Sequence, residues 1–178
     1  MTNNPNLRKE LQDAADIFHH IGHEAQAKII LGLTEIVPHS IQLISLNGKY
    51  NCYEYALGLW HLEEYKCVAR VYQDIFAGEE FIEFLLNSKK LHGIEEQNAQ
   101  PGDITIYFDG VIPKHAGIVQ HGKVHSKWGA GSLWKHEAFE VPSSYGDPTR
   151  YFSKVEDEQA AEYFKEWLKS KGIEETLL

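Results

Sequence analysis

Residues 101–128 read PGDITIYFDGVIPKHAGIVQHGKVHSKW, and this stretch decides the fold. Apolar and polar side chains alternate over residues 103–108. That period of two predicts a β-strand whose buried face carries Ile104, Ile106 and Phe108.

Two further strands follow in the same stretch, over residues 115–120 and 123–128. His121-Gly122 between them is typical of a tight hairpin turn. Shorter strands near 137–141 and 149–153 are expected to complete an antiparallel sheet.

Helical periodicity flanks these strands. Helices are predicted over residues 7–35, 52–61, 77–90 and 156–171, with a break in the first at Gly22 or Gly32. Helices first and an antiparallel sheet second are typical of an α+β domain.

The length of 178 residues suits one domain over 1–178. We expect an N-terminal helical segment over 1–40, a core over 45–155 and a C-terminal helix over 156–172. Hydrophobic residues make up 43% and charged residues 24%, as in ordinary soluble proteins. The net charge of −9 argues against nucleic acid as a partner, because phosphate contacts need clustered Lys and Arg.

The first residues, Met1-Thr2-Asn3-Asn4-Pro5-Asn6, are polar and lack the apolar core of a signal peptide. No run approaches the ~20 apolar residues that a membrane span needs. We therefore expect a cytoplasmic protein without membrane contact. Export by a route without a cleaved signal and a protein partner both stay open.

Cys52 is the residue with the most distinctive placement. Asn51 before it and Glu54 three residues after Asn51 have the spacing of a capping box, which puts Cys52 in the first turn of a helix. Backbone N–H groups and the helix dipole there favour a thiolate. The other cysteine, Cys67, is predicted to be a buried structural thiol, and two cysteines do not indicate a disulfide framework.

Three motifs occur in a fixed order: Cys52 at a helix start, Pro101-Gly102-Asp103 before a strand, and His115-Ala116-Gly117 at the start of the next strand. This order resembles the papain-like superfamily, and within it the NlpC-type cell-wall endopeptidases and CHAP amidases. Tyr50-Asn51-Cys52 with Ser126-Lys127-Trp128-Gly129 downstream looks closer still to a poorly characterised bacterial branch. The resemblance covers roughly residues 45–146.

The resemblance implies a papain-like α+β fold and cleavage of an amide or peptide bond through a Cys thioester. It implies that Cys52 is the nucleophile and His115 its acid/base, with a peptide or amide substrate and neither cofactor nor metal. Members of these families usually carry a small residue after the cysteine, an export signal and cell-wall-binding repeats. Here Tyr53 follows, and the other two features are absent from this sequence, which argues against peptidoglycan as substrate.

A third polar residue on the next strand is expected to orient the imidazole, and His125 is the first choice by position. A two-residue turn at His121-Gly122 would pair Val119 with Val124 and turn His125 to the face opposite His115. A bulge or wider loop would then be needed for His125, and Ser126 is the competing residue.

The remaining site residues are expected to serve the substrate. The Cys52 backbone N–H would form part of an oxyanion hole, with Tyr50 or Asn51 as a further donor. Trp128 and Trp134 either line a substrate cleft or belong to the core.

Other readings compete with hydrolysis. His19 and His23 at i, i+4 have a spacing that can hold zinc on a helix, and His115, His121 and His125 form a second histidine set. A non-catalytic papain-like binding or immunity module, and a cysteine acyltransferase or deamidase on the same fold, are the two alternatives for function.

Overall fold

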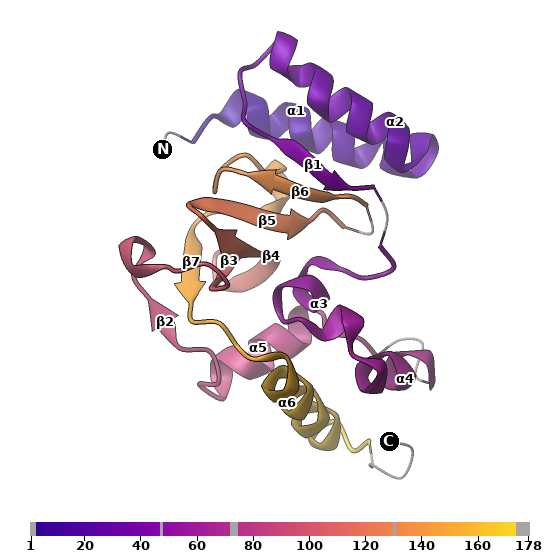
Figure 1. The fold of residues 1–178 in the computed structure, drawn as a ribbon, viewed down its shortest axis with the longest axis vertical. Helices are drawn as coiled ribbons and strands as arrows, with labels where there is room; N and C mark the ends of the chain where they lie inside the picture. The colour runs from indigo at the N-terminus through magenta and orange to yellow at the C-terminus, as the bar shows by residue number, and fades with distance from the viewer. Residues whose placement is uncertain (1–2, 47, 72–74, 130, 174–178) are drawn as a thin grey trace.

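The computed structural model describes residues 3–46, 48–71, 75–129 and 131–173 (Figure 1). Its helices are α1 (Pro5–Asp16), α2 (Phe18–Gly32), α3 (Cys52–Ala56), α4 (Glu63–Val71), α5 (Glu79–Asn87) and α6 (Asp157–Ser170). Its strands are β1 (Gln42–Ser45), β2 (Gly93–Ile94), β3 (Ile104–Asp109), β4 (Ile112–Gln120), β5 (Lys123–Lys127), β6 (Leu133–His136) and β7 (Thr149–Phe152). Short 3₁₀ turns lie at Leu33–Glu35, Leu59–His61, Glu96–Asn98 and Ser143–Tyr145.

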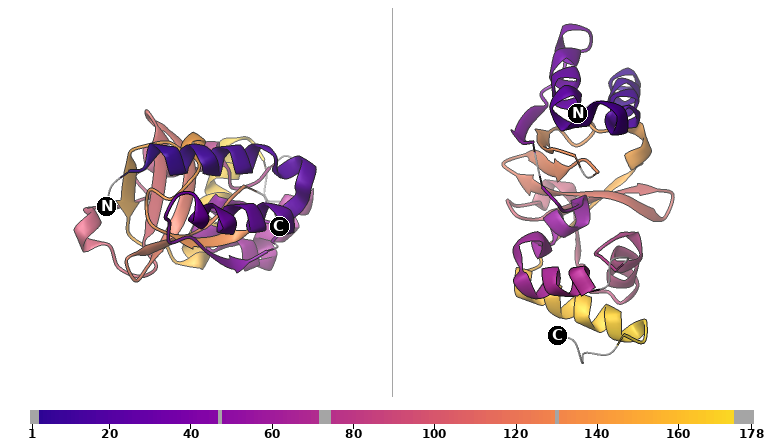
Figure 2. Two further views of the ribbon diagram at one scale, coloured as in Figure 1. Left: turned by 90° about the horizontal axis from the view of Figure 1, so that it is seen from above. Right: turned by 90° about the vertical axis from the view of Figure 1, so that its right-hand side faces the viewer.

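The elements form three layers, which confirms an α+β architecture (Figure 2). α1 and α2 cover one face of the sheet, and α3, α4, α5 and α6 lie on the other side. The seven strands of the described residues are ordered β1-β6-β5-β4-β3-β7-β2, and every pairing is antiparallel.

Both faces of the sheet are buried. Nearly every side chain of β3 is therefore buried, and not only every second one. Ile104, Ile106 and Phe108 face α3 to α6 as predicted, in a cluster around Phe81 that we call the Phe81 core. Tyr107 points the other way, into a second cluster beneath α1 and α2 that we call the Trp134 core. The sheet therefore separates two hydrophobic cores.

The register of β4 and β5 sets which side chains share a face. Val119 pairs with Val124 across a two-residue turn, as the sequence predicts for that turn length. On β3 and β4, Tyr107 lies opposite His115. Because side chains alternate along a strand, His115, Val119 and Val124 all face the Trp134 core.

Gly117 is required by the close packing of these two strands. A Cβ there would lie 2.5 Å from Val124 Cγ1 and 2.9 Å from Ser126 Cβ. Gly117→Ala is therefore expected to destabilise the protein by about 1–3 kcal/mol, measured by urea unfolding. Gly93→Ala is the matched control, since a Cβ at that strand glycine meets nothing within 4 Å. An equal loss of stability in both variants would contradict this explanation.

The first predicted helix is broken at Gly22, as expected, and also at Ile17, which was not predicted. The chain leaves α1 after Asp16, and α2 is kinked at Gly22, whose φ of 76° is non-helical. His19 and His23 lie on either side of that kink in the backbone, and the predicted zinc pair falls in part outside the described residues. The side chains of residues 18–20 lie outside the described part of the structure.

The segment after Cys52 also differs. α3 ends at Ala56 because Gly58 adopts a left-handed φ of 69°, and α4, which was not predicted, follows. α4 buries Tyr65 and Val68, and this turns Cys67 to the solvent. The prediction that Cys67 is buried is wrong, and both cysteines are free thiols.

Three strands differ from the prediction. β6 occupies Leu133–His136, N-terminal to the strand expected near 137–141, and neither β1 at Gln42–Ser45 nor the two-residue β2 at Gly93–Ile94 was predicted. β1 pairs with β6 at the edge of the sheet formed by the described residues, and it shows a register irregularity between Leu43 and Ser45. The alternation over its four residues is too short to be a clear signal.

Candidate functional site

The start of α3 is fixed by the predicted capping box. Asn51 Oδ1 accepts hydrogen bonds from the backbone N–H groups of Tyr53 (2.8 Å) and Glu54 (2.9 Å). Glu54 Oε2 in turn accepts from the Asn51 backbone N–H at 2.5 Å. The Asn51 side-chain amide donates to the Ala77 carbonyl at 3.0 Å. Because that amide is already engaged, Asn51 positions the helix rather than acting as a free oxyanion donor.

Cys52 lies in the first turn of α3, buried to 7% exposure against β4. Backbone N–H groups of Ala116, Tyr53 and Cys52 itself point to the sulfur and act to lower the pKa of the thiol. Burial outweighs them and raises this pKa to about 12. The predicted ready-made thiolate is therefore wrong for this structure, because desolvation exceeds the effect of the N–H groups.

His115 occupies β4, one residue before the N–H group that reaches Cys52. Its ring is stacked on Tyr145, with centroids 3.9 Å apart and planes at 19°, and lies 5.4 Å from the Tyr107 ring. Burial lowers the pKa of His115 well below its usual value, and nearby His136 adds to this. Its Nε2 atom is buried without a hydrogen-bond partner among the described residues.

The expected orienting residue, His125, is not beside His115. It lies opposite Ile118, so its side chain faces away from the Trp134 core that holds His115. The two-residue turn forms without the bulge that would bring the two histidines together. Ser126 has the correct face, since it lies opposite Trp134 on β6.

Ser126 is part of a buried polar chain with His136, a residue that sequence reasoning missed. His136 Nδ1 lies 2.7 Å from the Glu137 carbonyl, which can only accept, so this nitrogen carries the proton. Nε2 of His136 therefore accepts from the Ser126 hydroxyl at 2.7 Å. Trp128 Nε1 donates to the same hydroxyl at 3.1 Å.

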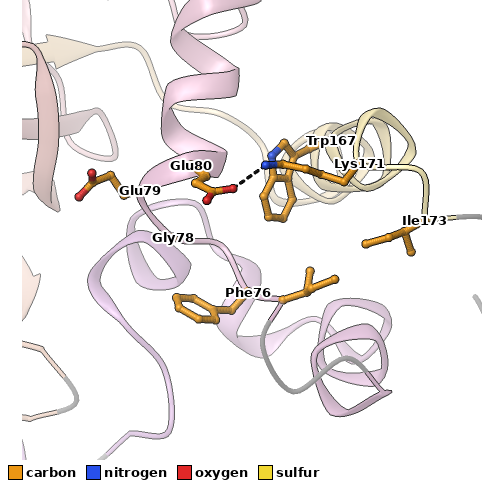
Figure 3. A pocket seen from close by; sticks show the side chains of 8 residues that line it. Phe76, Gly78, Glu79, Glu80, Trp167, Lys171 and Ile173 are labelled. Atoms are coloured by element: carbon orange, nitrogen blue, oxygen red, sulfur yellow. Dashed lines mark hydrogen bonds and ion pairs between the residues drawn. The ribbon is translucent and has the colours of Figure 1, made fainter.

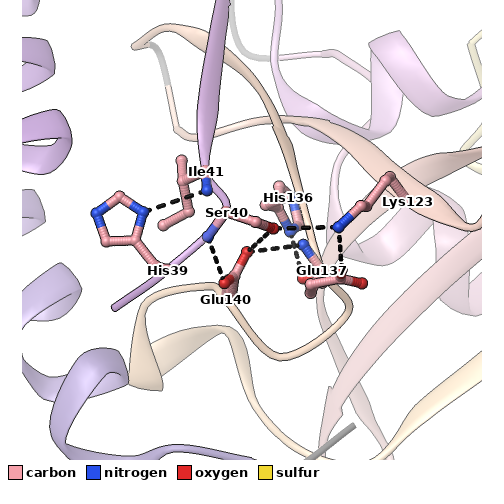
Figure 4. Close-up of polar contacts among 7 residues, drawn as sticks. All are labelled: His39, Ser40, Ile41, Lys123, His136, Glu137 and Glu140. Carbon is pink, nitrogen blue, oxygen red and sulfur yellow. Dashed lines mark hydrogen bonds and ion pairs between the residues drawn. The ribbon is translucent and has the colours of Figure 1, made fainter. Parts of the chain in front are cut away.

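A carboxylate cluster extends this chain toward the surface (Figure 4). Glu140 accepts from the Ser40 backbone N–H at 2.7 Å, the Ser40 hydroxyl at 2.8 Å and the Glu137 N–H at 3.0 Å. Lys123 pairs with Glu137 and also donates to the Ser40 hydroxyl at 3.2 Å. These hydrogen bonds connect the segment after β6 to Ser40, just before β1. They help to fix the position of the neighbouring His136.

The aromatic candidates divide between the core and an open pocket. Trp128 (4% exposed) and Trp134 (0%) pack together in the Trp134 core, so neither lines a cleft. Tyr50 instead borders a cavity of about 460 Å³ beside α3. The Lys127 ammonium lies 5.1 Å from the centre of the Tyr50 ring.

No group of three or more His, Cys, Asp or Glu side chains among the described residues is arranged to hold a metal ion. His115 and His125 face opposite sides of the sheet, so the second predicted histidine set does not assemble. Within the described part of the chain, no helix is long and apolar enough to cross a membrane.

The fold and the site together define an α+β protein in which Cys52 is buried in the Phe81 core where α3 meets β4, while the His115 ring is buried against Tyr107 and Tyr145 of the Trp134 core. The chain belongs to a family defined by a domain of unknown function (DUF7689), whose model matches residues 44–153. No curated protein and no solved structure matches the chain.

Proposed function

We propose that this protein is a papain-like, cysteine-dependent hydrolase that cleaves an amide or peptide bond through a thioester on Cys52, with His115 as acid/base. One observation carries the proposal: the thiol at the capped start of α3 receives the N–H of Ala116, the neighbour of His115. The order of Cys52, Pro101-Gly102-Asp103 and His115 along the chain supports it.

The chemistry requires the sulfur to attack a carbonyl carbon while its proton passes to the imidazole. In this scheme the acceptor is Nε2 of His115, which is buried without a hydrogen-bond partner among the described residues. The C–N bond then breaks, and the imidazolium returns the proton to the departing amine. Water hydrolyses the thioester, again with the imidazole as base. In this mechanism the Cys52 backbone N–H at the helix start serves as one oxyanion donor.

The two groups react as a neutral pair in this scheme. Burial raises the pKa of Cys52 to about 12 and lowers that of His115, so a standing thiolate–imidazolium pair is disfavoured. The proton therefore moves as the sulfur attacks, which is general-base catalysis.

Thiol labelling tests the pairing of Cys52 with His115. In wild-type protein near neutral pH, we expect iodoacetamide to modify Cys52 at least about 10-fold faster than in His115→Ala, because the imidazole assists loss of the thiol proton. Peptide mass mapping separates Cys52 from exposed Cys67, whose rate serves as an internal reference. Equal Cys52 rates in the two proteins would contradict the proposal.

A non-catalytic binding module is the second candidate, and a specific observation favours it. Cys52 and His115 are 7% and 1% exposed, and the Tyr145 ring covers the imidazole. On this reading Cys52 is a packing residue, and its labelling is slow and independent of His115. An acyltransferase or deamidase would share the first step of the proposed mechanism and differ in the acceptor or amine.

A further inference from the structure

A cavity of about 460 Å³ lies beside the Cys52 helix, a size suited to a small ligand or part of a peptide. Tyr50 and Glu54, which flank Cys52 in sequence, both line it. Trp60 and Tyr65 supply further aromatic surface. The cavity therefore adjoins the turn of chain that carries the proposed nucleophile.

The aromatic wall of this cavity is held in place by its neighbours. The Tyr50 and Trp60 rings lie 4.9 Å apart, and Tyr50 also stacks on Tyr55 at 6.1 Å. Gly48 contacts the Tyr50 ring closely: a Cβ added at Gly48 would lie only 2.3 Å from a ring carbon of Tyr50. The wall therefore presents a continuous aromatic surface, with the Tyr50 and Trp60 rings tilted by 31° to each other.

The rim of the cavity is positive in a protein of net charge −9. Lys49, Lys66 and Arg70 line it. Lys66 is paired with Glu63 at 2.8 Å. Lys49 and Arg70 make neither a hydrogen bond nor an ion pair with any residue that the structure describes, and Arg70 acts on Glu63 only at longer range.

The acidic lining residue, Glu54, has no carboxylate oxygen free for a ligand. Glu54 is buried, and its two oxygens are taken by the Asn51 N–H at 2.5 Å and the Tyr65 hydroxyl at 2.6 Å. Two cations without an ion-pair partner among the described residues, beside an aromatic wall, thus match a ligand with an apolar body and negative charge.

A second pocket lacks this combination (Figure 3). It has a volume of about 370 Å³ and lies between the start of α5 and the end of α6. Lys171 and Glu80 pair with each other across it at 2.5 Å, and Glu79 pairs with Lys114 at 3.0 Å. Its charges are already matched within the protein, so it offers no comparable preference for a charged ligand.

We propose that the Tyr50–Trp60 cavity binds an acidic peptide segment, with an aromatic or apolar side chain on the Trp60 ring and carboxylates at Lys49 and Arg70. This assigns the substrate class of the hydrolase and so rests on the proposed function. The cavity would hold the acidic part of the substrate while the amide lies at Cys52.

Tryptophan fluorescence reports directly on this cavity. Trp60 is 39% exposed, whereas Trp128, Trp134 and Trp167 are 4%, 0% and 7% exposed, so a peptide stacking in the cavity perturbs mainly Trp60. The probe is N-acetyl-tyrosylaspartate, and its neutral twin is N-acetyl-tyrosylasparagine amide. Titrations use Cys52→Ala, which retains the cavity and lacks the thiol.

We expect saturable binding of the acidic peptide and at least about 5-fold weaker binding of the neutral twin, as two favourable surface charge contacts would give. The double variant Lys49→Gln/Arg70→Gln, made in the same background, should bind the acidic peptide about 5-fold more weakly. The matched control is Lys28→Gln/Arg150→Gln, which removes the same charges at exposed positions outside the cavity lining and should bind unchanged.

Three outcomes would overturn the cavity proposal. They are equal affinity for the two peptides, an equal loss of affinity in the control variant, and no saturation with the acidic peptide. These outcomes are independent of the thiol, because every titration is made without it. The two proposals can fail separately. If the peptides bind with the expected charge dependence but the Cys52 labelling rate does not change in His115→Ala, the cavity proposal stands and only the hydrolase proposal is overturned.

Discussion

Cys52→Ala is expected to lower turnover by about 10³-fold or more, because the variant has no atom that can form the thioester. The measurement is hydrolysis of a panel of fluorogenic peptide amides, with the wild-type protein first used to find an accepted sequence. Circular dichroism and urea unfolding check that the variant is folded, since removal of one buried sulfur leaves only a small cavity.

Cys67→Ala is the matched control for this prediction. Cys67 is exposed on α4, so its replacement should change neither turnover nor stability by more than about 0.5 kcal/mol. Retained turnover in Cys52→Ala, or its loss in a folded Cys67→Ala, would show that Cys52 is not the nucleophile.

Stability is expected to fall as the pH drops below 6.5, because two buried histidines are held neutral. Burial lowers the pKa of His136 from 6.5 to about 4, and that of His115 also lies well below 6.5. Between pH 6.5 and 4 the unfolded chain binds more protons than the folded one, so the free energy of unfolding rises with pH there. His136 alone contributes about 2–3 kcal/mol over this window, and His115 adds in the same direction.

Urea unfolding at several pH values in this window measures the effect. His136→Asn, which keeps a neutral polar group in the Ser126 chain, should flatten the pH dependence even if its stability at neutral pH is lower. His121→Asn is the control: His121 is exposed in the hairpin turn with a φ of 50°, a conformation that Asn tolerates. A wild-type profile without slope below pH 6.5, or an unaltered slope in His136→Asn, would contradict the prediction.

The local signals in the sequence predicted much of the fold and part of the site. The alternation over residues 103–108 gave β3, and the two-residue turn at His121-Gly122 gave the pairing of Val119 with Val124. The Asn51 and Glu54 spacing gave the start of α3. These features depend on residues close together in the chain, where capping and turn geometry act directly.

Features that depend on tertiary burial were missed or wrong. His136 and Tyr145 approach His115 only through tertiary structure, because β6 joins the sheet beside β5 and the Ser143–Tyr145 turn contacts β4; no local pattern marks them. The thiolate expected at Cys52 fails for the same reason: a helix start favours the charge, but the desolvation that opposes it comes from packing against the sheet. His125 was placed by its order after His115, although the alternation of side chains turns it away.

The two cores on opposite faces of the sheet determine which segments the folded unit must include. The family segment, 44–153, includes the sheet strands from the end of β1 onward but neither α1 and α2 nor α6. Leu7, Leu11 and Ile30 cover Trp134 on one face, while Phe164 and Trp167 cover Phe81 on the other. A fragment cut at the family limits would present both of these apolar surfaces to water and favour self-association. The shared sequence thus marks the part of this protein that is related to others, while the burial of its two apolar faces depends on helices outside that part.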